Sequence, residues 1–405
     1  MKKHFAFISM PAAGHVNPTL PLVAELLRRG HRVSYAIGRE MASTVQASGA
    51  EILELPTELP KIPPQDQPGP PPVAKLMQFF IDDIRASFPP LRQRFRADPP
   101  DAVCFDVMTS TGRMLAQDLD VPAIALVPSF AANENFSLRD VLDADNAGFP
   151  TEAFAEFGSR MQQVGAEFGV RAELPFGAPP AELNLVFLPR EFQLRADTFD
   201  QRFRFIGPLL GERAETPWKP RDPHAPLLFI SLGTAFNNRP EFYRMCFEAF
   251  GGSHWQIAMS TGQHIDQAQL GAIPANFDVR ASFPQPAVLR HTTAFLSHTG
   301  MNSTMESLHA GVPLVAVPQM PEQAANAARV EELGLGRRLK PETVTATDLR
   351  AAVDTIAADE QVRANLDRMR EIIRGCGGAP AGADALETHL SCPPGKRQWP
   401  ARYGK

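Results

Sequence analysis

The sequence predicts an α/β protein with two domains, each built on a parallel sheet that helices cover on both faces. Residues 4–10 form an apolar run of strand length, and residues 32–37 form the next one. The segment between them has apolar side chains at helical spacing: Leu20, Val23, Leu26 and Leu27. Strand, helix and strand in this order form a βαβ unit, whose ligands bind at the carboxyl ends of the strands. An apolar run at 227–233 starts the same pattern again.

A proline-rich segment divides the chain into these two halves. Residues 211–226 are charged and carry four prolines, which is typical of an interdomain linker. We therefore expect a first domain at 1–210 and a second at 227–380, followed by a C-terminal helix and tail at 381–405. Another proline-dense stretch, 55–72, predicts an exposed loop.

Composition excludes several classes of function. With 405 residues, 44% of them hydrophobic, the chain is long enough for two sizeable cores. A net charge of -5 without basic clusters argues against a nucleic-acid partner. The four cysteines are far apart and form no CxxC pair, so neither a disulfide framework nor a zinc site is indicated. An apolar run of 18 residues and a signal peptide are both absent, so we expect a cytoplasmic protein without stable membrane insertion.

The most informative stretch is 294–323, which reads as strand, turn, short helix, strand and polar loop. The predicted helix, 303–310, ends at Gly311 and directs free backbone N–H groups at whatever lies before it, which favours a phosphate. Polar side chains gather around this point, namely His298, Asn302, Ser303, Glu306, Glu322 and Gln323. A structural alternative stays open. Ser303 and Glu306 also fit a capping box, and Glu322 and Gln323 fit a solvated loop.

Two further polar residues follow predicted strands of the first domain. His15 comes after the first strand, where Asn17 and Pro18 fit the N-cap and first turn of a helix. Asp106 ends the strand predicted at 101–106. Parallel strands end at one edge of the sheet, so the two side chains can meet there. From spacing alone, His15 could equally be a bystander and Asp106 a helix cap.

These motifs resemble a known family. His298-Thr-Gly-Met-Asn-Ser303, Glu306, Gly311-Val-Pro and Pro318-Gln with Glu322-Gln323 are similar to the donor-sugar signature of the UDP-sugar glycosyltransferases. The resemblance is strongest to bacterial macrolide glycosyltransferases that act on antibiotics such as oleandomycin. It implies the GT-B fold, in which two Rossmann-like domains face each other across a cleft and the C-terminal helix crosses back to the first domain.

The resemblance also implies roles for individual residues. His15 matches the catalytic base in the family's Gly-His-x-Asn-Pro, and Asp106 matches the aspartate that orients it. The implied donor-binding residues are Thr234, Ser282, Phe283, Gln285, His298, Gly300, Asn302, Ser303, Glu306, Glu322 and Gln323. No Asp-x-Asp motif lies in a suitable loop, so no metal or other cofactor is expected.

One position departs from the family pattern. The family usually has tryptophan two residues before the Pro-Gln that grips the uracil, whereas this chain has Ser282 there, followed by Phe283. Either Phe283 stacks on the base instead, or the base is held more weakly. The phenylalanine-rich region at 128–177 matches the part of the family that helps to form the acceptor cleft, although most of these rings are expected in the core.

The expected activity is inverting transfer of a hexose, glucose above all, from a UDP-sugar to a hydroxyl of a lipophilic small molecule such as a macrolide. Flavonoids or other phenols are alternative acceptors. A non-catalytic auxiliary protein of a true transferase, or a nucleotide-sugar epimerase or hydrolase, is the alternative to a transferase. The expected assembly is a monomer or homodimer.

Overall fold

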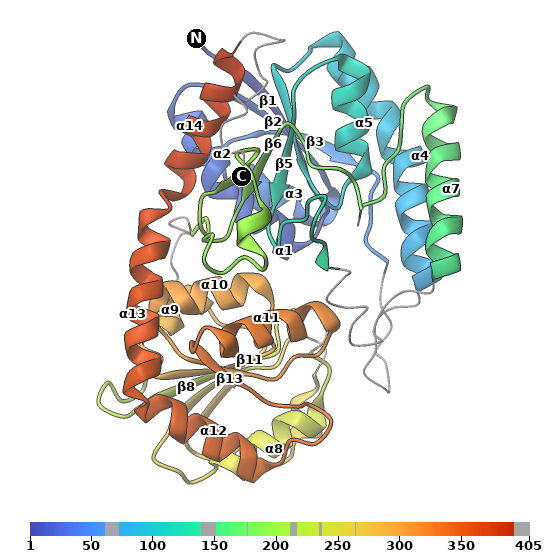
Figure 1. Ribbon diagram of the computed structural model, residues 1–405. Helices are drawn as coiled ribbons and strands as arrows, with labels where there is room; N and C mark the ends of the chain where they lie inside the picture. Colours follow the sequence, from blue (N-terminus) through green and yellow to red (C-terminus); the bar gives the residue numbers. More distant parts are fainter. Residues whose placement is uncertain are drawn as a thin grey trace. The chain divides into compact units, whose positions relative to one another are not determined.

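The computed structural model describes residues 1–60, 73–138, 151–175, 177–210, 217–234, 237–263 and 265–392. The stretch 61–72 of the expected exposed loop, 211–216 of the linker and 393–405 of the tail lie outside these residues. The described chain divides into two compact units (Figure 1). The first lies within 1–62, 70–211 and 376–405, and the second within 212–375.

The first unit has a seven-stranded sheet in the order β3-β2-β1-β4-β5-β6-β7. All neighbouring strands are parallel, as the sequence predicts. The strands are β1 (His4–Ile8), β2 (Arg32–Gly38), β3 (Glu51–Leu55), β4 (Ala102–Asp106), β5 (Ala123–Val127), β6 (Leu183–Val186) and β7 (Phe203–Phe205). The order runs one way from β1 to β3 and the other way from β4 to β7. The topological switch point therefore lies between β1 and β4, where this class of sheet binds ligands.

Helices cover both faces of this sheet (Figure 1). They are α1 (Ala13–Val16), α2 (Leu20–Arg28), α3 (Arg39–Gln46), α4 (Val73–Ala97), α5 (Ser110–Leu119), α7 (Thr151–Glu167) and α14 (Gly378–Ser391). Side chains of α2 and α14 share one core cluster with β1, β2 and β4. Ion pairs hold α14 on α2: Arg29 Nη1 lies 2.6 Å from Asp384 and 2.9 Å from Glu387. On the opposite face, Gly112 of α5 lets the helix approach Phe105.

Two details of this unit bear on the predictions. Asn17 does not cap a helix, which corrects our expectation: the helical stretch already begins at Ala13, and Asn17–Thr19 is a 3-10 turn inside it. His15 thus lies on the first turn of this stretch. Most of the described phenylalanines at 128–177 are buried, as expected, including Phe130, Phe136 and Phe157.

The second unit has a six-stranded parallel sheet in the order β10-β9-β8-β11-β12-β13, with its switch point between β8 and β11. The strands are β8 (Leu227–Ser231), β9 (Gln256–Ser260), β10 (Phe277–Arg280), β11 (Ala294–Ser297), β12 (Leu314–Ala316) and β13 (Gly336–Arg338). The helices are α8 (Pro240–Phe250), α9 (Gln285–Leu289), α10 (Met301–Ala310), α11 (Pro321–Glu332), α12 (Ala346–Ala358) and α13 (Glu360–Gly375). Among the described residues, no helix is both long and apolar enough to cross a membrane.

Candidate functional site

His15 and Asp106 meet at the switch point of the first sheet. The chain leaves β1 one register position from the end of β4, because Ile8 pairs with Phe105 and β4 ends at Asp106. The Nδ1 atom of His15 lies 2.6 Å from Oδ2 of Asp106. Asp106 is fully buried, with 1% of its side chain exposed, whereas His15 keeps 27% exposed. The backbone N–H of Met108 donates to the other carboxylate oxygen at 2.7 Å.

This geometry decides between the interpretations of Asp106 that spacing leaves open. The cap interpretation is wrong, because α5 begins after Thr109 and no side chain caps it. Both carboxylate oxygens instead hold other groups, the imidazole and the Met108 amide. An ionised carboxylate only accepts hydrogen bonds, so the Nδ1 atom of a neutral His15 ring carries the proton and Nε2 is the ring nitrogen that can accept one. The arrangement is suited to a general base oriented by a carboxylate.

The second cluster surrounds the start of α10 in the second unit. This helix begins at Met301 after Gly300, two residues earlier than predicted, and no side chain caps it. The capping-box interpretation of Ser303 and Glu306 is therefore wrong. Glu306 is buried, and its Oε2 accepts a hydrogen bond from Nε2 of Gln285 at 2.8 Å. The same nitrogen donates to Ser303 Oγ at 3.1 Å, so residues 18 positions or more apart form one polar group.

His298 is buried just before the start of α10. It packs between Gly233, which follows β8, and Gly300, which precedes α10. A Cβ on Gly233 would come within 2.4 Å of its Nε2, and one on Gly300 within 2.5 Å. Burial lowers the pKa of His298 to about 4, so the ring is neutral at pH 7. Its Nδ1 has no hydrogen-bond partner among the described residues. A buried polar atom without a partner costs free energy that a bound ligand can offset.

The loop before α11 is hydrogen-bonded to both neighbouring segments. The backbone N–H of Gln319 donates to Oε1 of Gln323 at 2.8 Å, which leaves the Gln323 amide group as a donor. Arg239, at the start of α8, donates to Oε1 of Gln319 at 2.6 Å. Thr299 Oγ1 donates to the Gln323 carbonyl at 3.0 Å. Three segments at the carboxyl ends of the strands thus hold one another in place.

The ring of Phe283 packs against two aromatic rings and one guanidinium group of the same unit. Its ring packs edge-on against Trp218 and Phe229, with centroids 6.2 and 6.0 Å away. The guanidinium of Arg280 lies 4.9 Å from the centre of the same ring. Ser282 is exposed and presents no ring. This packing favours the interpretation in which the nucleotide base is held more weakly.

Comparison with known proteins identifies the family. The model of "UDP-glucoronosyl and UDP-glucosyl transferase" matches residues 226–375. An NDP-glycosyltransferase of Bacillus subtilis (strain 168) is 42% identical, over 96% of this chain and 98% of its own. The chain belongs to this glycosyltransferase family.

Further relatives confirm the GT-B fold and the resemblance to antibiotic glycosyltransferases. The oleandomycin glycosyltransferase of Streptomyces antibioticus is 31% identical, over 96% of this chain and 91% of its own. The crystal structure of a calicheamicin glycosyltransferase matches with a TM-score of 0.83 and 36% identity, and covers 96% of this chain and 98% of that one.

In the glycosyltransferase, the second unit brings together the predicted residues at the carboxyl ends of β8 and β11. Thr234 is exposed beyond β8, Asn302 lies on the first turn of α10, and Glu322 lies on the first turn of α11. The sequence analysis missed Arg239 and did not nominate Gln319. No sequence signal links them, because 80 positions separate the two residues.

We expect Gly233→Ala to weaken binding of the nucleoside diphosphate. The added Cβ would displace His298, and alanine is also strained at the glycine's φ of +78°. Loss of one hydrogen bond to a charged group corresponds to about tenfold in affinity. Calorimetric titration with UDP measures the change.

Gly252→Ala is the matched control for this experiment. Gly252 has φ of +66° in the same unit, and an added Cβ there meets nothing within 4 Å. It should lower stability by about 1–2 kcal/mol through backbone strain alone. Equal loss of UDP affinity in both variants would show that the contact with His298 is unimportant.

We expect Arg239→Gln to impair use of the sugar donor more than binding of UDP. The loss of its hydrogen bond to Gln319 loosens the segment that holds Gln323. Arg244→Gln is the control, because Arg244 is exposed on α8 and, among the described residues, its side chain hydrogen-bonds only the carbonyl of Pro240 one turn earlier. Steady-state kinetics should show kcat/KM for the donor reduced about tenfold, as for one lost hydrogen bond to a charged group. If Arg239→Gln lowered UDP affinity as much as kcat/KM, the prediction that Arg239 acts on use of the sugar donor more than on UDP binding would be wrong.

Proposed function

We propose that the glycosyltransferase moves a hexose, glucose above all, from a UDP-sugar to a hydroxyl of a lipophilic natural product, with a macrolide as the favoured acceptor class. The observation that carries the proposal is the His15–Asp106 pair, with an exposed imidazole edge over a buried carboxylate. The proposed acceptor class is supported by the oleandomycin glycosyltransferase among the relatives.

In the proposed reaction, Nε2 of His15 takes the proton of the acceptor hydroxyl. The acceptor oxygen then forms a bond to the anomeric carbon, while the bond from that carbon to the diphosphate oxygen breaks. The nucleoside diphosphate leaves with the electron pair, and attack from the opposite face inverts the anomeric centre. Asp106 stabilises the imidazolium that forms. The proton then leaves His15 for solvent.

The second unit would bind the donor in this proposal. The N–H groups at the start of α10, with His298 and Thr234, would face the diphosphate. Glu306, held by Gln285, would accept hydrogen bonds from the ribose hydroxyls. Glu322 and the amide group of Gln323 would bind the sugar. We propose that these groups stabilise the developing charge without a metal ion.

The proposed activity is tested with a panel of UDP-sugars and acceptors, macrolides and phenols, analysed by mass spectrometry. A macrolide that gains the mass of one hexose supports the proposal. Hexose transfer to phenols alone would assign the other acceptor class. Release of free sugar from UDP-glucose at an equal rate without acceptor would identify a hydrolase instead.

We expect His15→Ala to lower kcat about 10²–10⁴-fold, the usual contribution of general base catalysis. UDP affinity should stay unchanged, because His15 belongs to the first unit. His254→Ala is the control, since this exposed histidine lies before β9 at the opposite, amino edge of its sheet. A His15→Ala variant with more than about a tenth of the wild-type kcat would exclude the base role.

The packing of Phe283 predicts weak selection of the nucleotide base. Stacking on an aromatic ring contributes about 1–3 kcal/mol per base, and Arg280 already lies against this ring. We therefore expect UDP and CDP, which share the ribose and the diphosphate and differ only in the base, to bind with affinities within about tenfold of each other. Competitive calorimetry measures the ratio, and a preference for UDP of about a hundredfold would contradict the prediction.

A further inference from the structure

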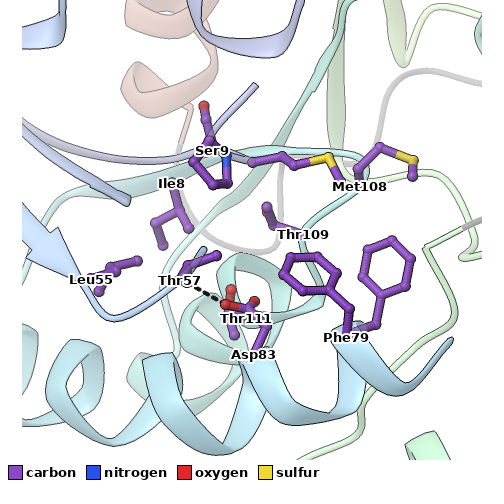
Figure 2. A pocket seen from close by; sticks show the side chains of 12 residues that line it. Ile8, Ser9, Leu55, Thr57, Phe79, Asp83, Met108, Thr109 and Thr111 are labelled. Atoms are coloured by element: carbon purple, nitrogen blue, oxygen red, sulfur yellow. Dashed lines mark hydrogen bonds between the residues drawn. The ribbon is translucent and has the colours of Figure 1, made fainter. Parts of the chain in front are cut away.

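A cavity in the first unit lies where the chain leaves the carboxyl ends of β1 and β4 (Figure 2). Its walls include Ser9, Met10 and Pro11, which lead from β1 toward His15, and also Met108 and Thr109, which follow Asp106. The other lining side chains are apolar at Ile8, Leu55, Phe79 and Phe80, and polar at Thr57, Asp83 and Thr111. The cavity volume is about 10 Å³, enough for one water-sized group.

One carboxyl group interrupts this apolar lining. Asp83 extends from α4 into the cavity wall, and Figure 2 shows it hydrogen-bonded to Thr57. Ser87 Oγ donates to the same oxygen, Oδ1, at 2.9 Å. Thr57 and Ser87 are themselves buried, so the two hydroxyls hold the carboxyl in a fixed orientation.

Asp83 is partly buried, and it differs in its partners from the carboxylates whose side chains are almost fully buried in this unit. Asp118, with 4% of its side chain exposed, lies within 2.5 Å of Arg92 and 2.9 Å of Arg96. Asp106 contacts His15. For Asp83, burial raises the pKa of the carboxyl and only the hydroxyls of Thr57 and Ser87 oppose this, so no cation of the described residues compensates it.

The ionisable neighbours of Asp83 on α4 have other partners. Asp82 is exposed and accepts a hydrogen bond from Gln78 at 2.7 Å. Arg85 forms its ion pair with Glu167, at 2.5 Å. A buried carboxylate usually has a cationic partner, because desolvation without one is costly. The missing partner can come from a ligand that reaches the cavity.

We propose that Asp83 is the ion-pairing group for a basic amino group on the acceptor. This inference rests on the proposed function, since the cavity is lined by the segments that lead from β1 toward His15 and from Asp106 toward α5. A single ammonium group has about the size of the cavity, and its attraction to a carboxylate is strong in apolar surroundings. Asp83 is thus a specificity-determining residue that selects acceptors carrying an amine.

The test uses two acceptors that share one scaffold and one reacting hydroxyl, and differ only in an amino group or a hydroxyl at a second position. Wild-type enzyme should show a kcat/KM at least about tenfold higher for the amine, as expected for one charge-assisted hydrogen bond. In Asp83→Asn the ratio should fall to about one. Asp82→Asn, one residue away and exposed, should keep the wild-type ratio.

Two results would overturn the inference: a wild-type ratio near one, or an Asp83→Asn variant that keeps the amine preference. If Asp83→Asn does not fold, the wild-type protein is tested by competition. A small cyclic amine should then inhibit transfer to a neutral acceptor about tenfold more strongly than the alcohol of the same shape. Equal inhibition by the amine and the alcohol would contradict the inference.

Failure of the proposed function gives a different result. If neither acceptor is glycosylated although UDP binds, the transferase proposal fails. The amine and the alcohol can still be compared by direct calorimetric titration of the wild-type protein. Tighter binding of the amine, lost in Asp83→Asn, would support the role of Asp83 independently of transfer, and equal binding would overturn it.

Discussion

The arrangement of both sites depends on one topological constraint, the reversal of strand order at the centre of each parallel sheet. At such a switch point, the chains leaving two adjacent strands run to opposite faces of the sheet and leave space at the carboxyl edge. In the first unit this point lies between β1 and β4, where His15 and Asp106 form their hydrogen bond. In the second it lies between β8 and β11, where His298 packs on Gly233.

The carboxyl groups of Asp106, Glu306 and Asp83 have different kinds of partner, and the partner determines the chemistry that each group can perform. Asp106 accepts from an imidazole and a backbone amide, which stabilise its charge and fix the tautomer of His15. Glu306 accepts from the neutral amide of Gln285 and remains able to accept hydroxyls. Asp83 has only hydroxyl donors, so its desolvation is not compensated by a cation of the described residues. Burial without a matching charge thus distinguishes a binding group from a structural one such as Asp118.

The residues proposed to bind the donor owe their positions to polar contacts between distant segments. Gln285 joins α9 to α10, Arg239 joins α8 to Gln319, and Thr299 joins β11 to Gln323. Thr299 adopts a φ of +60°, unusual for a β-branched residue, and hydrogen bonds through its side chain and its carbonyl hold it there. Such cross-linking keeps ligand-binding groups in fixed geometry, which reduces the free energy lost when a ligand orders them.

The fold class, most element positions and the family resemblance could be predicted from the sequence alone, because they depend on local periodicity and on residues close together in the chain. Predictions from local spacing were wrong where two local structures have the same residue spacing. Asn17 was predicted to cap a helix, and Ser303 with Glu306 also fitted a capping box, but neither forms a cap. Only the tertiary structure decided that Asp106 bonds His15 across 91 positions, that Gln285 holds Glu306, and that Arg280 lies on Phe283. The physical reason is that hydrogen bonding and burial depend on which segments the sheet brings together, and a capping motif and a binding site can use the same residues at the same spacing.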